Sequence, residues 1–406
     1  MKSFTALLGA SAGTHAADQL ALASLPLTAS LLLGAGPDLI GGLVAAQSAA
    51  WLLVTLPAGA WADATSRRRL LVLGLLLGLA GALAAIAGAV MGSALLLGLA
   101  TFVAASGTVI YVLTAIALLP GLVAATELPR ANARLELARA VVSLAAPLVA
   151  GTLAQALSPT WGYGLAAVGA AVALGFVLAL PPTPVLAATA RPSLPAAIRI
   201  GAGFVWRHAL LRGISLCAVF WNFAFFALLA IWAPLALDVL RLDPARMGLA
   251  QSAYGAGLVL GALAAPAIAR HLPPRAVLLF GPAVSVVAAG LFGIAFATGA
   301  SAAGGFLAAA VGHFLVGFGP MLWLVCQTTV RQLVTPPPLL GRVNATVQVA
   351  IYGVRPLGAL AGGLTAAQAG LGAALAMVGA AFALSTLVIL LSPLVRLRAL
   401  PQPVAA

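Results

Sequence analysis

Long apolar runs follow one another along the chain, and a short polar or Gly/Pro-containing segment separates each run from the next. An α-helix needs about 20 consecutive apolar residues to cross a bilayer. The runs are continuously apolar and do not alternate with period two, so they predict membrane helices and not the strands of a β-barrel. We expect twelve spans, at residues 4–33, 40–62, 70–91, 94–120, 138–157, 163–180, 211–237, 246–269, 276–297, 302–332, 344–368 and 371–392.

The composition points to the same fold class. Of the 406 residues, 63% are hydrophobic and only 7% are charged, and the mean hydropathy is +1.15. A soluble globular protein of this length carries far more charge, so the sequence predicts an all-α, polytopic membrane protein. Lys2 leads directly into the first run with no cleavage site before a polar domain, and we therefore expect no signal peptide.

The twelve expected spans divide into two sets of six. The segment that begins at Asp63, after the second span, corresponds to the segment that begins at Arg270, at a shift of 207 residues. Similar shifts relate other parts of the chain, which indicates two parallel repeats related by an axis along the membrane normal. We predict six-helix bundles at 1–180 and 211–406, joined by a polar cytoplasmic loop at 181–210.

The formal net charge of +13 is distributed as a topology signal. Basic residues gather in alternate loops and not in one patch, which argues against a nucleic-acid partner. By the positive-inside rule, both termini and the central loop are cytoplasmic, beside the anionic membrane lipid of a bacterial-type inner (plasma) membrane. The basic side holds Lys2, Arg67–Arg69, Arg130, Arg134, Arg139, Arg191, Arg199, Arg207, Arg212, Arg270, Arg275, Arg331, Arg342, Arg396 and Arg398.

Polar and aromatic side chains are spread unevenly over the helices. Every third helix, beginning at residues 70, 163, 276 and 371, has few of them, so these four are expected to face lipid. The other eight helices are expected to line a cavity whose mixed surface suits amphipathic or aromatic compounds. The candidate substrate contacts are Gln47, Tyr111, Trp221, Asn222, Gln251, Tyr254, His313, Gln327, Gln348 and Tyr352.

A carboxylate stands inside the first apolar run. Asp18 follows His15 by three residues and precedes Gln19, so all three lie on one face of a helix. A charged side chain near the bilayer centre costs roughly 2.5–3.5 kcal/mol on insertion scales, so this face must contact protein or a water-filled cavity. A protonatable carboxyl in a cavity is what proton-coupled transport requires. We therefore interpret Asp18, with His15 and Gln19, as a proton-coupling group.

A single arginine interrupts the eleventh span. Arg355 shares a helix face with Gln348 and Tyr352. An arginine inside a membrane is nearly always paired, and Asp18 is the only acidic residue expected near the same depth. The alternative is that Arg355 donates hydrogen bonds to the carbonyl groups that Pro356 leaves without a partner. We assign Arg355 to the cavity and leave both partners open.

The connection between the second and third spans carries a motif. Residues 59–71 read Gly-Ala-Trp-Ala-Asp-Ala-Thr-Ser-Arg-Arg-Arg-Leu-Leu. This sequence resembles the signature loop of the major facilitator superfamily, in which a glycine and an aspartate precede a basic cluster. Ala64 and Ser66 depart from the pattern, since a basic residue and a glycine are usual there. The resemblance implies that Gly59, Asp63, Arg67 and Arg68 form a gating loop.

Two further segments resemble the drug:proton antiporter branch of that superfamily, which includes siderophore exporters and macrolide-efflux-like proteins. They are Ala146-Pro147 through Gly151, and Gly353-Val-Arg355-Pro356. Members of the branch often carry an arginine in the fourth helix, and this chain has none there. The resemblance implies two bundles that rock about a central site, with hinges at Pro147, Gly151 and Pro356. These residues also suit a purely structural packing role.

The sequence thus predicts a monomeric, proton-coupled exporter of small amphipathic compounds such as drugs, siderophores or metabolites, working by alternating access. Three alternatives stay open: an importer or facilitator of a small metabolite, a lysophospholipid transporter, and a membrane sensor that transports nothing. The sequence contains no nucleophile–base pair, metal-ligand cluster or phosphate-binding loop, so we expect no enzymatic activity, cofactor or metal.

Overall fold

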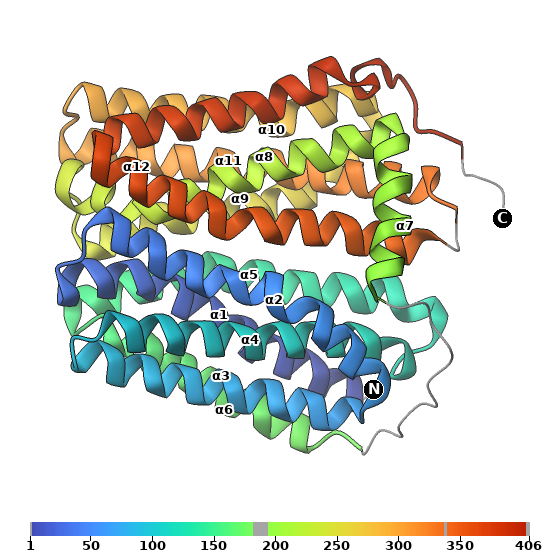
Figure 1. The fold of residues 1–406 in the computed structure, drawn as a ribbon, viewed down its shortest axis with the longest axis horizontal. Helices are drawn as coiled ribbons and strands as arrows, with labels where there is room; N and C mark the ends of the chain where they lie inside the picture. The colour runs from blue at the N-terminus through green and yellow to red at the C-terminus, as the bar shows by residue number, and fades with distance from the viewer. Residues whose placement is uncertain (1, 182–193, 337–338, 403–406) are drawn as a thin grey trace.

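The computed structural model describes residues 2–181, 194–336 and 339–402, and within them the protein is helical (Figure 1). Helices form because the apolar runs satisfy their backbone hydrogen bonds internally. The long helices are α1 (Lys2–Leu33), α2 (Pro37–Ala64), α3 (Arg67–Val90), α4 (Ala94–Leu118), α5 (Leu128–Ala156), α6 (Thr160–Leu178), α8 (Ala209–Pro234), α9 (Pro244–His271), α10 (Pro274–Ala297), α11 (Ala302–Val334) and α12 (Leu340–Leu391). The shorter helices are α7 (Leu194–Arg207), η1 (Leu119–Gly121), η2 (Ala125–Glu127), η3 (Leu235–Val239) and η5 (Pro393–Arg396).

The expectation of twelve crossings is confirmed. In the described ranges, eleven helices are long and apolar enough to cross a membrane, and α12 contains two of the expected spans. α12 changes direction at Gly370, whose φ of 87° and ψ of 163° are not helical. Glycine adopts this positive φ without the steric cost of a Cβ atom, so one residue suffices to reverse the chain.

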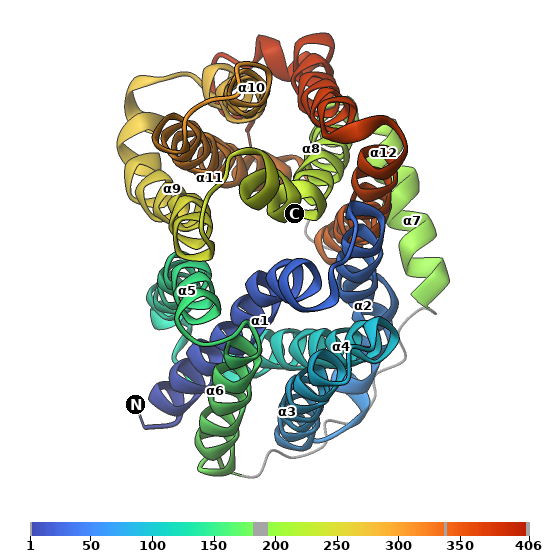
Figure 2. The ribbon, with the colours of Figure 1, turned by 90° about the vertical axis from the view of Figure 1, so that its left-hand side faces the viewer.

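The helices form two groups, and both termini lie at the same end of the molecule. Figure 1 shows α1–α6 in the lower half and α8–α12 in the upper half, with the termini and α7 on the right. We call this end the terminal end and the other the opposite end. Figure 2 looks along the helices from the opposite end and shows α3, α6 and α10 at the periphery. The limits predicted for two independent bundles, 1–180 and 211–406, stay a prediction.

The connection between the groups is not a simple loop. Residues 194–207 form α7, where the sequence predicts a polar connection, and Figure 1 shows α7 lying across the ends of the long helices. Val205 is buried with Leu211 and Val343, whereas Trp206 is 61% exposed. The prolines and arginines of the predicted loop at 181–210 concealed the amphipathic period of 3.6 residues in α7.

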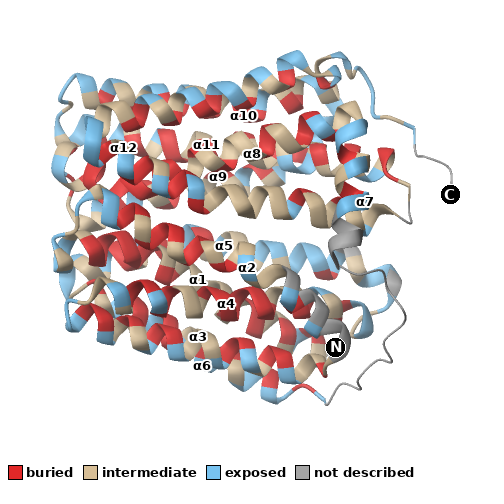
Figure 3. Ribbon diagram, in the orientation of Figure 1, coloured by how far each residue is buried: buried red, intermediate tan, exposed pale blue. Residues whose placement is uncertain are grey.

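The two groups meet closely at the opposite end along two seams. In the first, α2 contacts α12, where a Cβ atom added to Gly41 would lie 2.9 Å from the Cα atom of Gly363. In the second, α5 contacts α9, where a Cβ atom added to Gly151 would lie 3.0 Å from the Cα atom of Gly248. Only glycine allows two helix backbones to approach this closely. Figure 3 shows that α5 becomes exposed toward the terminal end, where the halves diverge.

Candidate functional site

A cavity of about 540 Å³ lies between the two groups of helices. Its lining comes from α1, α2, α4 and α5 on one side and from α8, α9, α11 and α12 on the other, and η1 adds Leu119 and α10 adds Pro282. No described residue of α3, of α6 or of the second arm of α12 lines it. The cavity extends toward the terminal end, where Leu119, Asn132, Arg331 and Val347 lie close to the ends of their helices.

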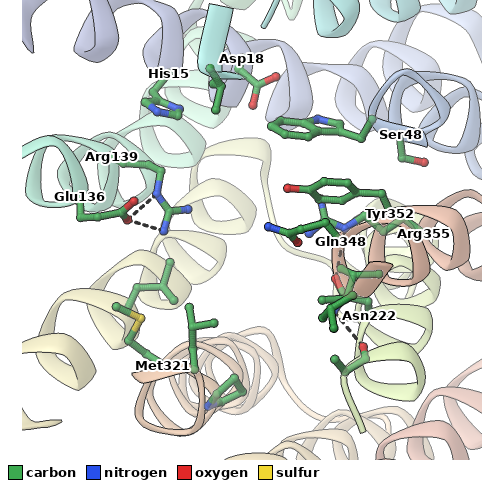
Figure 4. A pocket seen from close by; sticks show the side chains of 18 of the residues that line it. His15, Asp18, Ser48, Glu136, Arg139, Asn222, Met321, Gln348, Tyr352 and Arg355 are labelled. Atoms are coloured by element: carbon green, nitrogen blue, oxygen red, sulfur yellow. Dashed lines mark hydrogen bonds and ion pairs between the residues drawn. The ribbon is translucent and has the colours of Figure 1, made fainter. Parts of the chain in front are cut away.

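The α1 triad is part of this lining. His15, Asp18 and Gln19 all border the cavity and are half-buried, because their helix face points away from lipid. Gln19 donates a hydrogen bond from Nε2 to Oδ2 of Asp18 at 3.2 Å. Within the described part of the chain, no cationic side chain forms an ion pair with Asp18. The carboxyl is therefore open to the cavity and to proton exchange (Figure 4).

Arg355 of α12 lies on another wall of the same cavity. Among the described residues it forms no ion pair with Asp18, and the two charges interact only at longer range. The Nε atom of Arg355 donates a hydrogen bond to Oδ1 of Asn222 in α8 at 3.1 Å. The amide of Asn222 is oriented by its own bond from Nδ2 to the carbonyl oxygen of Ala218, at 2.9 Å. The guanidinium carbon lies 4.7 Å from the ring centroid of Tyr352 and 5.1 Å from that of Phe226. These cation–π contacts hold the arginine without neutralising it.

Aromatic rings line the cavity and also connect the two halves. Trp51 of α2 and Tyr352 of α12 have ring centroids 5.0 Å apart. Trp221 stacks on Phe225 at 5.2 Å, and Phe225 packs against Tyr254 at 5.2 Å. Trp221 also donates from Nε1 to Oγ of Ser285 in α10 at 2.9 Å, which gives this buried hydroxyl a partner. The cavity therefore offers flat apolar surfaces beside its charged groups.

Sequence reasoning missed three cavity residues that carry charge. Arg139 and Glu136 of α5 form an ion pair, with Nη2 and Oε2 2.7 Å apart, and Figure 4 shows them across the cavity from Arg355. Arg331 of α11 also lines the cavity. The positive-inside rule assigns both arginines to the cytoplasmic boundary, because they lie near predicted helix ends. The i, i+3 spacing of Glu136 and Arg139 was the available signal for a pair on one helix face.

Most of the remaining candidates border the cavity: Gln47, Tyr111, Trp221, Asn222, Tyr254, Gln327, Gln348 and Tyr352. The structure places Gln251 and His313 elsewhere, at a small void of about 30 Å³ inside the second half. The Nδ1 atom of His313 lies 2.9 Å from the carbonyl oxygen of Ala309. Its ring packs edge-on against Trp232, with centroids 4.5 Å apart. His313 is therefore held as a buried, hydrogen-bonded packing residue.

Of the predicted gating-loop and hinge residues, Arg67, Arg68, Pro147, Gly151 and Pro356 lie outside the cavity lining. Gly59 and Asp63 fall in the last turns of α2, and their side-chain surroundings lie outside the part that the structure describes. Arg67 begins α3, and Arg68 donates from Nη2 to the carbonyl oxygen of Leu178 at the end of α6, at 2.7 Å. Pro147 and Pro356 lie inside α5 and α12, and Gly151 belongs to the α5–α9 seam.

Comparison with curated proteins finds distant relatives. The chain is 29% identical over 228 residues to the enterobactin exporter EntS of Citrobacter koseri, which covers 55% of this chain and 51% of that protein. It is 28% identical over 225 residues to the enterobactin exporter EntS of Salmonella typhimurium, covering 55% and 52%. The chain thus matches about half the length of these relatives.

Comparison with solved structures finds the same fold. The nucleoside transporter NupG superposes with a TM-score of 0.75 at 14% identity, covering 96% of this chain and 98% of that one. A D-xylose–proton symporter superposes with a TM-score of 0.73 at 12% identity, covering 95% and 96%.

The family model of the Major Facilitator Superfamily matches residues 7–312. Twelve crossings around a central cavity and this match together show that the chain belongs to the Major Facilitator Superfamily.

Proposed function

We propose that this transporter exports a small amphipathic compound from the cytoplasm across the bacterial inner membrane and returns protons in exchange. The observation that carries the proposal is Asp18, a carboxyl in the central cavity with no cationic side chain of the described residues within ion-pair distance. The similarity to enterobactin exporters supports the outward direction. The likeness to NupG and to the xylose–proton symporter supports the fold alone.

The proposed cycle follows from where the cavity is open and where it is closed. With the terminal end in the cytoplasm, the cavity faces inward and the two glycine seams close the outer side. Asp18 releases its proton to the cytoplasm in this state, and the compound enters beside it. Rocking of the two halves then parts the seams and exposes the same cavity to the outside, where the compound leaves and Asp18 is protonated again.

The membrane potential supplies the driving force for the return step. Inward movement of one positive elementary charge releases about 2.3 kcal/mol of free energy per 100 mV of membrane potential. This is enough to bias a conformational transition of a few kcal/mol. Gln19 positions the carboxyl of Asp18, since it donates a hydrogen bond to it directly, and His15 borders the cavity on the same helix face. In this scheme Pro147, Gly151 and Pro356 act as the hinges at which the helices bend or slide. The protein works as a monomer.

The test is proton flux in proteoliposomes that contain an internal pH dye and an imposed pH gradient. We would add panels of cationic drugs, macrolides and catechol siderophores to wild type, to Asp18→Asn and to Asp38→Asn. Asp38 is the matched control, because it is an exposed carboxylate in the first turn of α2 and does not line the cavity. We expect compound-triggered proton flux in wild type and Asp38→Asn and none in Asp18→Asn.

Three other results would lead to different conclusions. Undiminished proton-driven transport by Asp18→Asn would remove Asp18 from the coupling role. Movement of labelled compound down its gradient, with no proton flux in any variant, would indicate a uniporter or a different coupling ion. Uptake driven by an inward proton gradient would identify an importer.

A further inference from the structure

The guanidinium group of Arg355 is oriented but not neutralised. Its Nε is used by Asn222, and its flat faces lie over Tyr352 and Phe226. No hydrogen bond from either Nη atom to a described residue is found, and no described carboxylate lies within ion-pair distance. The edge that carries the two Nη groups is the edge with which arginine binds a carboxylate or phosphate through two parallel hydrogen bonds.

A second cavity arginine also lacks a counter-charge. Arg331 lines the cavity from α11, and its buried Nε has no hydrogen-bond partner in the described structure. Arg139 differs from both, because Glu136 neutralises it and both side chains are well solvated, with exposures of 40% and 61%. Of the three cavity arginines, two therefore keep an unbalanced charge, and Asp18 balances one of them at most.

The sum of these charges selects the class of compound. Three guanidinium groups (Arg139, Arg331 and Arg355) face two carboxyl groups (Asp18 and Glu136), so the cavity holds one excess positive charge when all five are ionised. Water screens this excess while the cavity is open, but closure on both sides removes the water and makes an unbalanced charge costly. One anionic group on the bound compound would bring the closed cavity to neutrality.

The walls next to Arg355 define the rest of the compound. Tyr352 and Phe226 lie against Arg355, and the rings of Trp51, Trp221 and Tyr254 line the same cavity. Such rings favour a flat apolar body. We infer that the transported compound is an organic anion with a flat aromatic part, and that its anionic group binds the Nη edge of Arg355. This inference rests on the proposed transport through this cavity and names the substrate class.

The inference is compatible with proton exchange through Asp18. In the cytoplasm-facing state Asp18 is ionised, and the anion-loaded cavity is then neutral and ready to close. The empty carrier returns with Asp18 protonated. Over a full cycle, outward movement of an anion and inward movement of a proton both transfer positive charge inward. Because the loaded cavity is neutral and the empty cavity with protonated Asp18 is positive, the membrane potential acts on the return of the empty carrier and offsets the cost of closing over its unbalanced charge.

The experiment measures binding of three probes that share one ring system: 1-naphthoate, 1-naphthylmethylamine and 1-naphthalenemethanol. Radiolabelled 1-naphthoate is bound to purified protein, and the other two are used as competitors. We expect the anion to bind at least tenfold more tightly than the amine or the alcohol. Arg355→Gln should weaken anion binding by about tenfold or more, because it removes a charge-assisted hydrogen-bond pair. Arg275→Gln is the matched control, an exposed arginine outside the cavity, and should bind as wild type does.

Further variants keep the two proposals separable. Arg355→Lys and Arg331→Gln cover the case in which Arg355→Gln does not fold. Each of them alters the cavity wall less than Arg355→Gln and should still weaken anion binding. Asp18→Asn should bind 1-naphthoate at least as tightly as wild type while losing proton flux. Equal binding of anion and amine, or no binding of the anion, would overturn the inference and leave the role of Asp18 standing. Arg355-dependent binding together with undiminished proton-driven transport by Asp18→Asn would overturn the proposed coupling and leave the anion site standing.

Discussion

Two adjacent glycines of α2 allow a controlled test of the seams. A Cβ atom added to Gly41 would lie 2.7 Å from the carbonyl oxygen of Ala359 and 2.9 Å from the Cα atom of Gly363, both in the other half of the protein. A Cβ atom added to Gly42 would meet nothing within 4 Å. Gly41→Ala should therefore push the halves apart at the opposite end, and Gly42→Ala should not.

The size of the effect follows from the cost of overpacking. An extra methyl group in a well-packed contact costs about 1–3 kcal/mol. At Gly41 this cost arises only while the α2–α12 seam is closed, so the population of the seam-open state should rise by roughly 5- to 150-fold. The gain in helix propensity from Gly to Ala, about 1 kcal/mol, is common to both variants and to both conformations, so it cancels.

The assay is a distance measurement between spin labels at Met91 and Thr298. Both residues are exposed, and they cap α3 and α10 at the opposite end, one in each half. Cys217 and Cys326 are first replaced by alanine so that only the introduced cysteines react. We expect Gly41→Ala to shift the distance distribution toward longer values and Gly42→Ala to reproduce the wild-type distribution.

A clear negative result is available. Identical distance distributions for Gly41→Ala and Gly42→Ala would show that the seam does not hold the observed state together. Gly151→Ala in the α5–α9 seam should act in the same direction as Gly41→Ala, because its added Cβ atom would also contact backbone of the other half. Opposite effects of the two seam variants would contradict rigid rocking of the halves.

Three further predictions concern individual side chains. Asn222→Leu removes the acceptor of the Arg355 Nε hydrogen bond, so transport should show an approximately tenfold higher KM with kcat little changed; an unchanged KM would show that Asn222 does not position the arginine. Glu136→Gln breaks the exposed ion pair with Arg139, so the unfolding free energy should fall by less than about 1 kcal/mol, checked by thermal unfolding, while 1-naphthoate binding tightens. His313→Phe should keep proton flux near the wild-type rate, because the ring lies outside the central cavity; loss of flux would place His313 on a proton path.

Much of the fold follows from the sequence because each crossing depends on local properties. A continuous apolar run must form a helix in lipid, and the twelve runs are visible without tertiary information. The apolar pattern predicts a break between 368 and 371, and the structure makes that break a single residue, Gly370. The pattern does not predict α7, because its apolar face becomes useful only when packed against the beginning of α12, a contact between distant parts of the chain.

Site residues could be predicted from the sequence where their spacing along one helix shows which side chains share a face. His15, Asp18 and Gln19 share a face by spacing alone, and a charged face in a membrane helix has to point inward. Arg139 was missed because the positive-inside rule treats an arginine near a helix end as a topology marker. In the structure the cavity extends toward the terminal end as far as Arg139, which therefore lines it. Helices that are apolar on all sides do not reveal which face turns inward, so Gln251 and His313 were expected in the cavity and lie elsewhere.

The single-residue connection at Gly370 has a mechanical consequence. The other connections between consecutive crossings that the structure describes in full have two or more residues, which absorb displacement when helices shift, whereas the two arms of α12 are joined at Gly370 alone. We therefore expect the arm that carries Arg355 and the outer arm, which does not line the cavity, to move as one body. A change in bilayer thickness acts on the outer arm and costs a fraction of a kcal/mol per ångström of mismatch. That force is transmitted directly to the arm that carries Arg355. The thickness of the bilayer should therefore influence the conformational change of the substrate-binding arm.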